Sequence, residues 1–552
     1  MLDKIKHIDP DQITNVEEFR SVLLVLLNLI EDQAKRIETL EQEARGLKDE
    51  NAKLKGGNAR PQIKASVKEK INISSGGKEK GSKNHKRYEQ KAPIVIDRDI
   101  VVEVNVELLP ADAVRKGYSE YIQQDLVIVR DNKRFLLAQW YSPSLKQTIS
   151  AGFPAGELSG HFGAGVRSLI NILNHLGNVT EGTLGMLMKS FGVQISGGTI
   201  SNSLKSEHGW AVEEQTAILQ AALHRPEPKQ MDSTGNVQKG VNKTTHIITS
   251  SFFTVFYTLK GKSRLDCLRA LQGNPEQGLE LLWHGGIDAA FEEAGVGFAD
   301  RRAVNLLMAA KPCVGWSEFD ELMKLRAPKI FAKPKIMQLL REVMALTYYA
   351  HQTDFPALKV LLSDNAPEYN NIALFRALCW VHDARYYNKL NPQIAVHEKI
   401  LKNFKSQYWD FYDKLLDFKE QPRKIQKKQK ALLSTQFDQI FTPNTKYDAL
   451  NRAIERTKAN KAELLRVLDF PALPLHNNAA ELAARRVVRK RDISLHTWSD
   501  WGTQLRDAFM SIIETAIKLG ISAFDFIHDR ITKQFKMPSL ATVIYPNFSR
   551  TF

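Results

Sequence analysis

The stretch PKQMDSTGNV, residues 228–237, carries Asp232 from a short apolar strand into a Ser-Thr-Gly turn. Two runs of apolar and β-branched residues follow directly over residues 244–261, THIITSSFF and TVFYTLKG, and together with the first strand they predict an antiparallel meander. The next segment, SRLDCLRALQ (263–272), has the apolar spacing of a helix. The chain therefore places its first candidate acid at the start of an α/β domain.

A second aspartate ends a later apolar strand. In FPALKVLLSDNAPEY the strand LKVLL (358–362) leads to Asp364, and ALCWVH (377–382) reads as a fifth strand before further helices. Three strands, a helix, two strands and then helices are the order of a ribonuclease-H-like α/β fold. In that fold the first and fourth strands are neighbours, so we expect Asp232 and Asp364 to meet, an arrangement that a divalent cation stabilises.

A third acid lies in HNNAAELAARRVVRKRD (476–492), where Asn477 can cap a helix and Glu481 occupies its first turn. Two Asp and one Glu can hold a pair of Mg²⁺ ions about 4 Å apart, which activate a water or a 3′-hydroxyl and stabilise the leaving oxygen of a phosphodiester. The residues that suit phosphate contacts beside such a site are Arg485, Arg486, Arg489, Lys490 and Arg491.

Each acid also has a structural interpretation. Asp232 and Asp364 can be turn residues, and Glu481 can form an ion pair one helical turn along its own helix. The order of strand-Asp, strand-Asp and helix-Glu in one basic chain favours catalysis. Nearby titratable residues to which we assign no role are Asp266, Glu368, His382 and Asp383.

Composition limits the class of protein. With 552 residues, 43% of them hydrophobic, the chain is long enough for several folded domains, and its net charge of +15 favours polyanionic partners such as nucleic acid. Three distant cysteines without a C-x-x-C pair indicate neither a disulfide framework nor a zinc site, and fit a reducing cytosol. The longest apolar run, LLVLLNLI (23–30), is too short to cross a bilayer, so we expect no membrane association.

The N-terminal segment predicts a long helix. Residues 17–54 carry an apolar heptad seam, which favours a parallel coiled coil that makes a homo-oligomer and a multimerisation domain at 1–55. The alternative is one amphipathic helix that packs on its own domain. The seam positions are Ile30, Gln33, Ile37, Leu40, Ala44, Leu47, Asn51 and Leu54.

Two segments of different composition follow. Residues 56–92 form a linker rich in Gly, Ser and Lys, which either is only solvated or holds DNA phosphates without reading sequence. Residues 93–150 predict a β-rich segment, because PIVIDRDIVVEVNVE and DLVIVRDNKRFLLAQWY alternate apolar and polar residues.

Residues 151–225 predict a helical DNA-binding region. Three helical patterns separated by breaks lie within 164–207, with Thr180 and Ser196 as N-caps and Gly192 at a helix C-terminus. This is the pattern of a helix-turn-helix, although any three-helix unit would look similar. The side chains available to a DNA groove are Thr199, Ser201, Asn202, Ser203 and Lys205, with Ile200 and Leu204 left for the core.

The motifs resemble the bacterial transposases of the insertion-sequence-66 type, within the DDE superfamily. The resemblance rests on the Asp-Ser-Thr around Asp232, on LLSDNAPEYN with CWVHDAR, and on HNNAAELAARRVVRK with SIIETAIKLGISAFDFIHDRI (511–531). It implies that Asp232, Asp364 and Glu481 are catalytic and bind metal, with Mg²⁺ as the ion and Mn²⁺ as a substitute. It also implies that the substrates are transposon-end and target DNA, and that the reaction is strand cleavage and strand transfer.

The chain departs from the family pattern at several points. Strands without cysteine replace the usual cysteine-rich stretch, no Trp lies near Asp232, and Leu482 follows Glu481 where the family has Arg. Tyr386 replaces the second Arg expected after the CWxHxR motif, and residues 273–355 form an extra helical insertion. These departures indicate a divergent branch.

The remaining boundaries follow from these motifs. The core spans 226–391. A helical insertion spans 392–470 and either binds DNA or is a solvated surface. The helix with the third acid lies in 471–500, and 501–552 is helical. We expect a nucleoid-associated protein of the bacterial cytoplasm, and other element-encoded proteins are further candidate partners. The alternatives are a nuclease of the same fold, such as a junction resolvase, and a catalytically silent DNA-binding descendant of a transposase.

Overall fold

The computed structural model describes residues 15–54, 96–105, 110, 112–154, 157–158, 160–273, 278–284, 287–293, 296–309, 311–353 and 355–548. The chain forms two compact units, one made of Met1–Glu43 with Asn132–Phe552 and the other of Ala44–Asp131. The basic linker predicted at 56–92 lies outside the described residues. No helix in the described part of the chain is long and apolar enough to cross a membrane.

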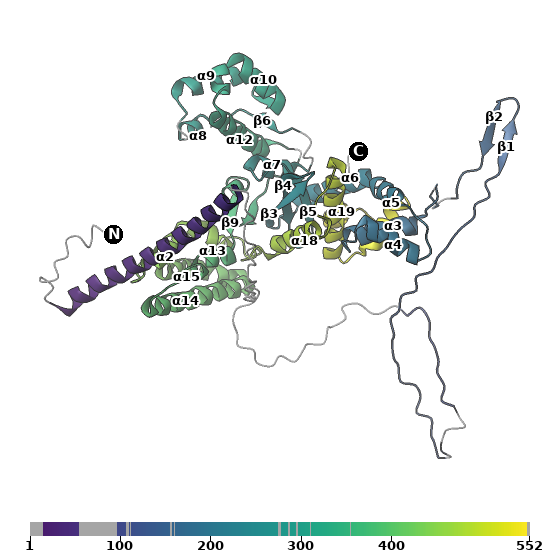
Figure 1. Cartoon of the computed structure of the whole chain (residues 1–552), viewed down its shortest axis with the longest axis horizontal. Coiled ribbons are helices and arrows are strands. Elements are labelled where there is room, and N and C mark those ends of the chain that lie inside the picture. The colour runs from purple at the N-terminus through teal and green to yellow at the C-terminus, as the bar shows by residue number, and fades with distance from the viewer. Residues whose placement is uncertain are drawn as a thin grey trace. The chain divides into compact units, whose positions relative to one another are not determined.

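A mixed sheet of five strands forms the centre of the larger unit (Figure 1). Its strands are β3 (Lys229–Gln238), β4 (Val241–Thr249), β5 (Thr254–Leu259), β8 (Val360–Ser363) and β9 (Phe375–Leu378), in the order β5-β4-β3-β8-β9. The first three run antiparallel, whereas β8 and β9 run parallel to β3. The prediction that the first and fourth of these strands are neighbours is therefore confirmed.

The fifth strand is shorter than the sequence suggested. The strand expected over 377–382 ends at Leu378, and Trp380 begins helix α13 (Trp380–Asn388). The indole of Trp380 is fully buried among aromatic side chains of the following helices, and its Nε1 donates to the carbonyl of Leu464. Tertiary packing thus overrides the β propensity of this apolar run.

Four helices pack on or beside the sheet. Helix α18 (Asn478–Ser494) contacts β3 and β4, and α19 (Asp500–Lys518) contacts β5. Helix α6 (His208–Leu223) packs on α19, and α7 (Arg264–Gln272) contacts β4 and β5. The predicted helix over 263–272 is confirmed, since Ser263 caps α7 in a capping box with Asp266.

Two insertions interrupt the sheet domain. The first comprises α8 (Ile287–Glu293), α9 (Phe298–Ala309), α10 (Trp316–Arg326), α11 (Pro328–Phe331) and α12 (Pro334–His351), together with a two-stranded ribbon of β6 (Glu280–Leu282) and β7 (Cys313–Gly315) that the sequence did not predict. The second is helical, as predicted, and comprises α14 (Ala395–Glu420), α15 (Arg423–Ile440), α16 (Asp448–Ala459) and α17 (Lys461–Leu464).

The segment predicted to be β-rich contains few strands. Among the described residues of 93–150, strands occur only in the hairpin of β1 (Gln139–Ser142) and β2 (Gln147–Ser150). Most of the described apolar side chains that suggested strands further upstream are exposed, for example Val101 and Val129. A strand needs a partner for its backbone and a cover for its apolar face, and an alternating pattern alone supplies neither.

The N-terminal helix α2 (Val16–Leu54) forms as predicted and packs on its own chain through one face. Asn28 accepts a hydrogen bond from the Asp448 backbone and donates to the carbonyl of Lys446, while Glu31 is buried against His397. The described apolar seam residues Ile30, Ile37 and Leu40 remain more than half exposed. The intramolecular contact thus uses a different face from the heptad seam.

Three short helices form the unit predicted as a helix-turn-helix. They are α3 (Ala164–His175), α4 (Glu181–Ser190) and α5 (Gly197–Lys205), and they contact one another. Thr180 and Ser196 cap α4 and α5 through their side chains, and Gly192 has a φ of 79°, so the three predicted helix-end residues are confirmed.

Candidate active site

The parallel pairing of β3 with β8 brings the two aspartates together. Lys229 pairs with Leu361 and Gln230 with Leu362, so continuing this register by two residues sets Asp232 beside Asp364. Asp232 lies within β3, which continues past β8, whereas Asp364 follows the last residue of β8. The two acids therefore lie side by side where β8 ends.

Glu481 reaches the same place from the first turn of α18. Asn477 precedes this helix and is fully buried, but its side chain does not cap the helix as expected; its amide instead donates to the carbonyl of Met231, 3.0 Å away. The Asn477 backbone also donates to Sγ of Cys379, at 3.3 Å. These bonds fix the start of α18 to the strand that carries Asp232 and to the start of α13.

The electrostatics of Asp232 show that the three acids share one environment. The pKa of the Asp232 carboxyl is raised to about 6, mainly by burial and in addition by the negative charges of Asp364 and Glu481. Two groups oppose this rise, the backbone N–H of Ser233, which donates to Oδ1 at 2.8 Å, and the guanidinium of Arg385. A nearby cation would favour the ionised form of this carboxyl.

Arg385 already supplies one cation to the third acid. Its Nη2 donates to both carboxylate oxygens of Glu481, at 3.2 Å each. His382, one turn earlier on α13, places Nε2 3.5 Å from Oε1 of Glu481, and burial together with Arg385 lowers the pKa of its imidazole. Both residues belong to the motif CWVHDAR, but nothing in that motif alone predicts their contact with Glu481.

Arg376 organises the loop that carries Asp364. From β9 it donates to the carbonyls of Asp364 and Ala366, at 2.7 and 3.1 Å, and to the side chain of Asn370. The Asp364 carboxylate itself accepts from the backbone N–H of Ala366 at 3.2 Å. Sequence reasoning missed this residue, because an arginine in a short strand has no distinguishing pattern.

The donor set suits a hard divalent cation. Three carboxylates supply only oxygen ligands, which Mg²⁺ prefers, and a cation would relieve the repulsion at Asp232. As they stand, no three His, Cys, Asp or Glu side chains in the described ranges lie close enough together to hold a metal ion. The pairing of Glu481 with Arg385 is the contact that metal binding would have to replace.

The cations predicted on α18 occupy different environments. Arg485 and Arg489 are exposed, one turn apart on the same helix face. Arg486 forms an ion pair with Glu514, 2.5 Å away, and Arg491 donates to the carbonyl of Gly235. Lys490 is buried and donates to the carbonyl of Asn174, and burial lowers its pKa to about 8.

The polar residues predicted on α5 also divide into two groups. Asn202 and Lys205 are exposed, and Thr199 lies partly exposed with its hydroxyl bonded to Ser196. Ser203, expected to face a groove, is instead buried because its position on the helix faces the core with Ile200 and Leu204.

Two acids without an assigned role have structural functions. The carboxylate of Asp383 accepts hydrogen bonds from the hydroxyls of Tyr408 and Thr457, at 3.2 and 2.8 Å, and burial raises its pKa to about 6. Asp266 completes the capping box of α7. Neither is positioned as a fourth member of the site.

One comparison with known proteins locates a family match in the part of the chain that contains two of these acids. Residues 348–505 match the model of the IS66 transposase family. This segment includes Asp364 and Glu481, and the predicted resemblance is thereby confirmed. An uncharacterized protein, y4jO of Sinorhizobium fredii (strain NBRC 101917 / NGR234), is 29% identical over 318 residues, which cover 57% of this chain and 94% of that protein. Its printed name assigns it no activity, so the IS66 match is the comparison that bears on function.

The burial of Asp232 leads to a stability prediction. At pH 7.5 in EDTA, Asp232→Asn should raise the free energy of unfolding by up to about 3 kcal/mol, because the wild-type chain keeps a charge whose folded pKa is about 6 against an unfolded value of 3.8. The gain should shrink as the pH falls from 6 toward 4, where the folded wild type binds the proton. Urea unfolding at each pH measures the gain in the free energy of unfolding and its change with pH, and Asp410→Asn at an exposed position is the control. An Asp232→Asn protein no more stable than wild type at pH 7.5 would contradict the prediction.

Proposed function

We propose that this protein is a DDE transposase with a ribonuclease-H-like core, which cleaves transposon-end DNA and transfers its strands to a target. The observation that carries the proposal is the β3–β8 register, which sets Asp232 beside Asp364 while the charge of Glu481 acts on the same carboxyl. The strand order β5-β4-β3-β8-β9, with two parallel strands beside an antiparallel meander, supports that core. The IS66 match over 348–505 supports the reaction class.

Asp232, Asp364 and Glu481 would hold two Mg²⁺ ions, or Mn²⁺ in their place. When bound, these ions supply the polarisation that activates a water or 3′-hydroxyl and stabilises the leaving oxygen. Asp232 binds metal only in its ionised form, so metal binding should weaken as the pH falls below about 6, where this carboxyl takes up a proton. Glu481 becomes available when Arg385 leaves it, and the released guanidinium suits a DNA phosphate.

The DNA-binding surface combines three elements. On α18, Arg485 and Arg489 are free to meet the phosphate backbone, whereas Lys490 is left out because it is buried. On α5, Asn202 and Lys205 face solvent, with Thr199 at the start of the helix. The basic linker would add binding that depends on salt and not on sequence.

Self-association would use the heptad seam of α2. Ile30, Ile37 and Leu40 are exposed although the opposite face of the helix is packed, which suits a parallel pairing with a second copy. A multimer brings two transposon ends together, and other element-encoded proteins could join it. A substrate on the bacterial chromosome implies a cytoplasmic, nucleoid-associated protein.

The deciding experiment is Mg²⁺-dependent joining of labelled transposon-end DNA, taken from the DNA flanking the gene, to a plasmid. Wild type should join the DNA in Mg²⁺ and not in EDTA, and Glu481→Gln should bind the ends without joining them, because an amide is a poor ligand for the metal. The matched control is Glu455→Gln on the exposed face of α16, which should join as wild type does. Cleavage without joining would favour a nuclease. Binding without either reaction, even with neighbouring element-encoded proteins added, would favour a silent DNA-binding protein.

A further inference from the structure

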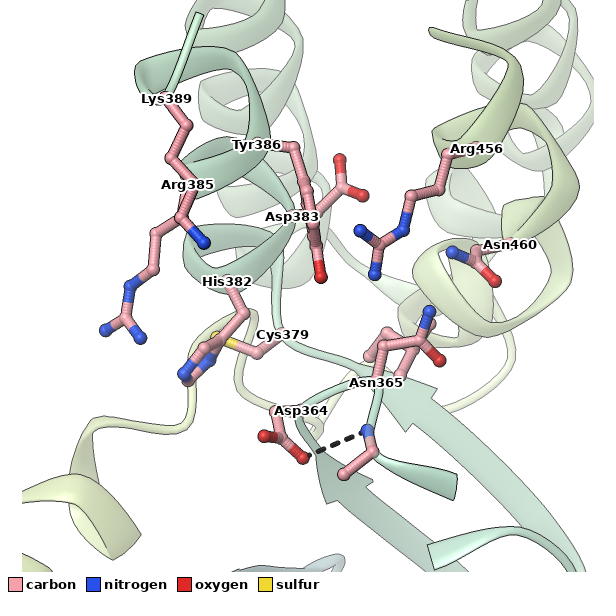
Figure 2. A pocket seen from close by; sticks show the side chains of 12 residues that line it. Asp364, Asn365, Cys379, His382, Asp383, Arg385, Tyr386, Lys389, Arg456 and Asn460 are labelled. Atoms are coloured by element: carbon pink, nitrogen blue, oxygen red, sulfur yellow. Dashed lines mark hydrogen bonds between the residues drawn. The ribbon is translucent and has the colours of Figure 1, made fainter. Parts of the chain in front are cut away.

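A cavity of about 310 Å³ opens beside Asp364, between the sheet and the second helical insertion. Its walls come from the loop after β8, from α13 and from the end of α16. Figure 2 shows Asp364 at the end nearest the strands, and Tyr386 and Arg456 pointing toward one another from their two helices. This volume is at the lower limit of small-ligand sites and is far too small for a DNA duplex.

The cavity combines flat surfaces with positive charge. The guanidinium carbon of Arg456 lies 3.2 Å from the ring centroid of Tyr386, and Nζ of Lys389 lies 5.7 Å from the same ring. Within the described residues, neither Arg456 nor Lys389 lies within 4.0 Å of a carboxylate oxygen, so both charges remain available to an anion. Aromatic rings and guanidinium planes are the surfaces on which unpaired bases stack, and cations bind the adjoining phosphates.

Polar groups at the rim add the means to bind a base edge. The amides of Asn365 and Asn460 face one another across the cavity in Figure 2, and each offers both donors and an acceptor. The acid in the wall, Asp383, accepts hydrogen bonds from Tyr408 and Thr457, and it interacts with the charge of Arg456 without a direct ion pair. The lining therefore suits a ligand with a flat ring, hydrogen-bonding edges and a negative charge.

We propose that this cavity receives one nucleotide extruded from the DNA duplex next to the bond that is cut. The base stacks on the Tyr386–Arg456 pair, Asn365 and Asn460 contact its edge, and Lys389 meets the adjoining phosphate. The proposal rests on the proposed function. If Asp364 acts at the reacting phosphate, its place at the end of the cavity sets how far the extruded nucleotide lies from that phosphate. It concerns a position where this chain departs from the family pattern, since Tyr386 stands where an Arg was expected.

The test places 2-aminopurine, whose fluorescence rises when it leaves the base stack, at each nucleotide around the cleavage site of the end DNA. Binding is measured in Ca²⁺, and joining is measured separately in Mg²⁺. Wild type and Tyr386→Phe should raise the fluorescence at one position. Tyr386→Ala should bind the DNA about 5- to 150-fold more weakly and give no rise at saturation, because stacking contributes about 1–3 kcal/mol per base. A mismatch at that position, which lowers the cost of extrusion, should restore part of the affinity.

The outcomes separate this inference from the proposed function. Joining in Mg²⁺ without a fluorescence rise at any position would overturn the extruded nucleotide and leave the transposase intact. A rise that persists in Tyr386→Ala would also overturn it, because the base would then lie elsewhere. Failure of the wild type to bind the end DNA would overturn both proposals.

Discussion

Replacing Asp364 with Asn is expected to lower the rate of Mg²⁺-dependent strand joining by at least about 10³-fold, which corresponds to roughly 4 kcal/mol of transition-state stabilisation. The reason is loss of a charged metal ligand and not loss of structure. An Asn side chain keeps the oxygen that accepts from the Ala366 backbone, and Arg376 holds the loop through main-chain carbonyls that the substitution does not touch. Joining of labelled ends measured at saturating DNA gives the rate.

The control is Asp410→Asn, which removes the same charge from an exposed position on α14. It should join at a rate within about twofold of wild type, as most surface substitutions do. End binding by Asp364→Asn should also stay near the wild-type affinity, since the residue is acidic and repels phosphate. If Asp364→Asn joined DNA at the wild-type rate, Asp364 would have no part in the reaction.

The sequence predicts well those parts of the structure that depend on local signals. Apolar runs before Asp232 and Asp364 predicted the central strands, and an order of elements known for one α/β fold predicted that those strands are neighbours. The turn expected directly after Asp232 was wrong, because β3 continues to Gln238 in pairing with β4. Thr180, Gly192 and Ser196 predicted helix ends correctly because capping depends on a few adjacent backbone groups.

The failures have a common cause in long-range packing. Trp380 lies in a helix because an aromatic cluster from distant helices surrounds it, and the described residues between 96 and 138 lack strands because nothing covers their apolar faces. The same holds for the candidate site. Glu481 could be placed at a helix start, but its bond to Arg385, 96 residues away, depends on the fold. Asn477 was expected to cap a helix and instead bonds to Met231 across the core.

Helix α2 contacts the second insertion, a feature that the sequence left open. Breaking this contact should strongly change the hydrogen exchange of the helix. Glu31 is 2% exposed, and its carboxylate contacts the buried imidazole of His397 while accepting from the hydroxyl of Tyr447 at 3.0 Å and the backbone N–H of Gln393 at 3.2 Å. Lys35 donates to the same tyrosine hydroxyl at 3.1 Å. Glu31→Ala would leave the buried imidazole of His397 and the buried hydroxyl of Tyr447 without their acceptor.

Breaking such a buried pair costs about 3–5 kcal/mol, which is about 10²- to 5 × 10³-fold in the opening equilibrium of the contact. We therefore expect hydrogen exchange of the α2 amides to accelerate by that factor in Glu31→Ala. The control is Glu38→Ala, an exposed position on the same helix, which should leave exchange unchanged. Unaltered exchange in Glu31→Ala would mean that this network does not hold the helix.

The oligomeric mass of the same variant separates the two interpretations of α2. If the exposed seam of Ile30, Ile37 and Leu40 pairs with a second copy, Glu31→Ala should keep the wild-type mass, because the substitution lies off the seam. Its joining activity should nevertheless fall, since the helix that brings two copies together would no longer be fixed to the insertion beside Asp364. A variant that loses both docking and self-association would show instead that the packed face and the seam act as one interface, with the multimer assembled through the insertion.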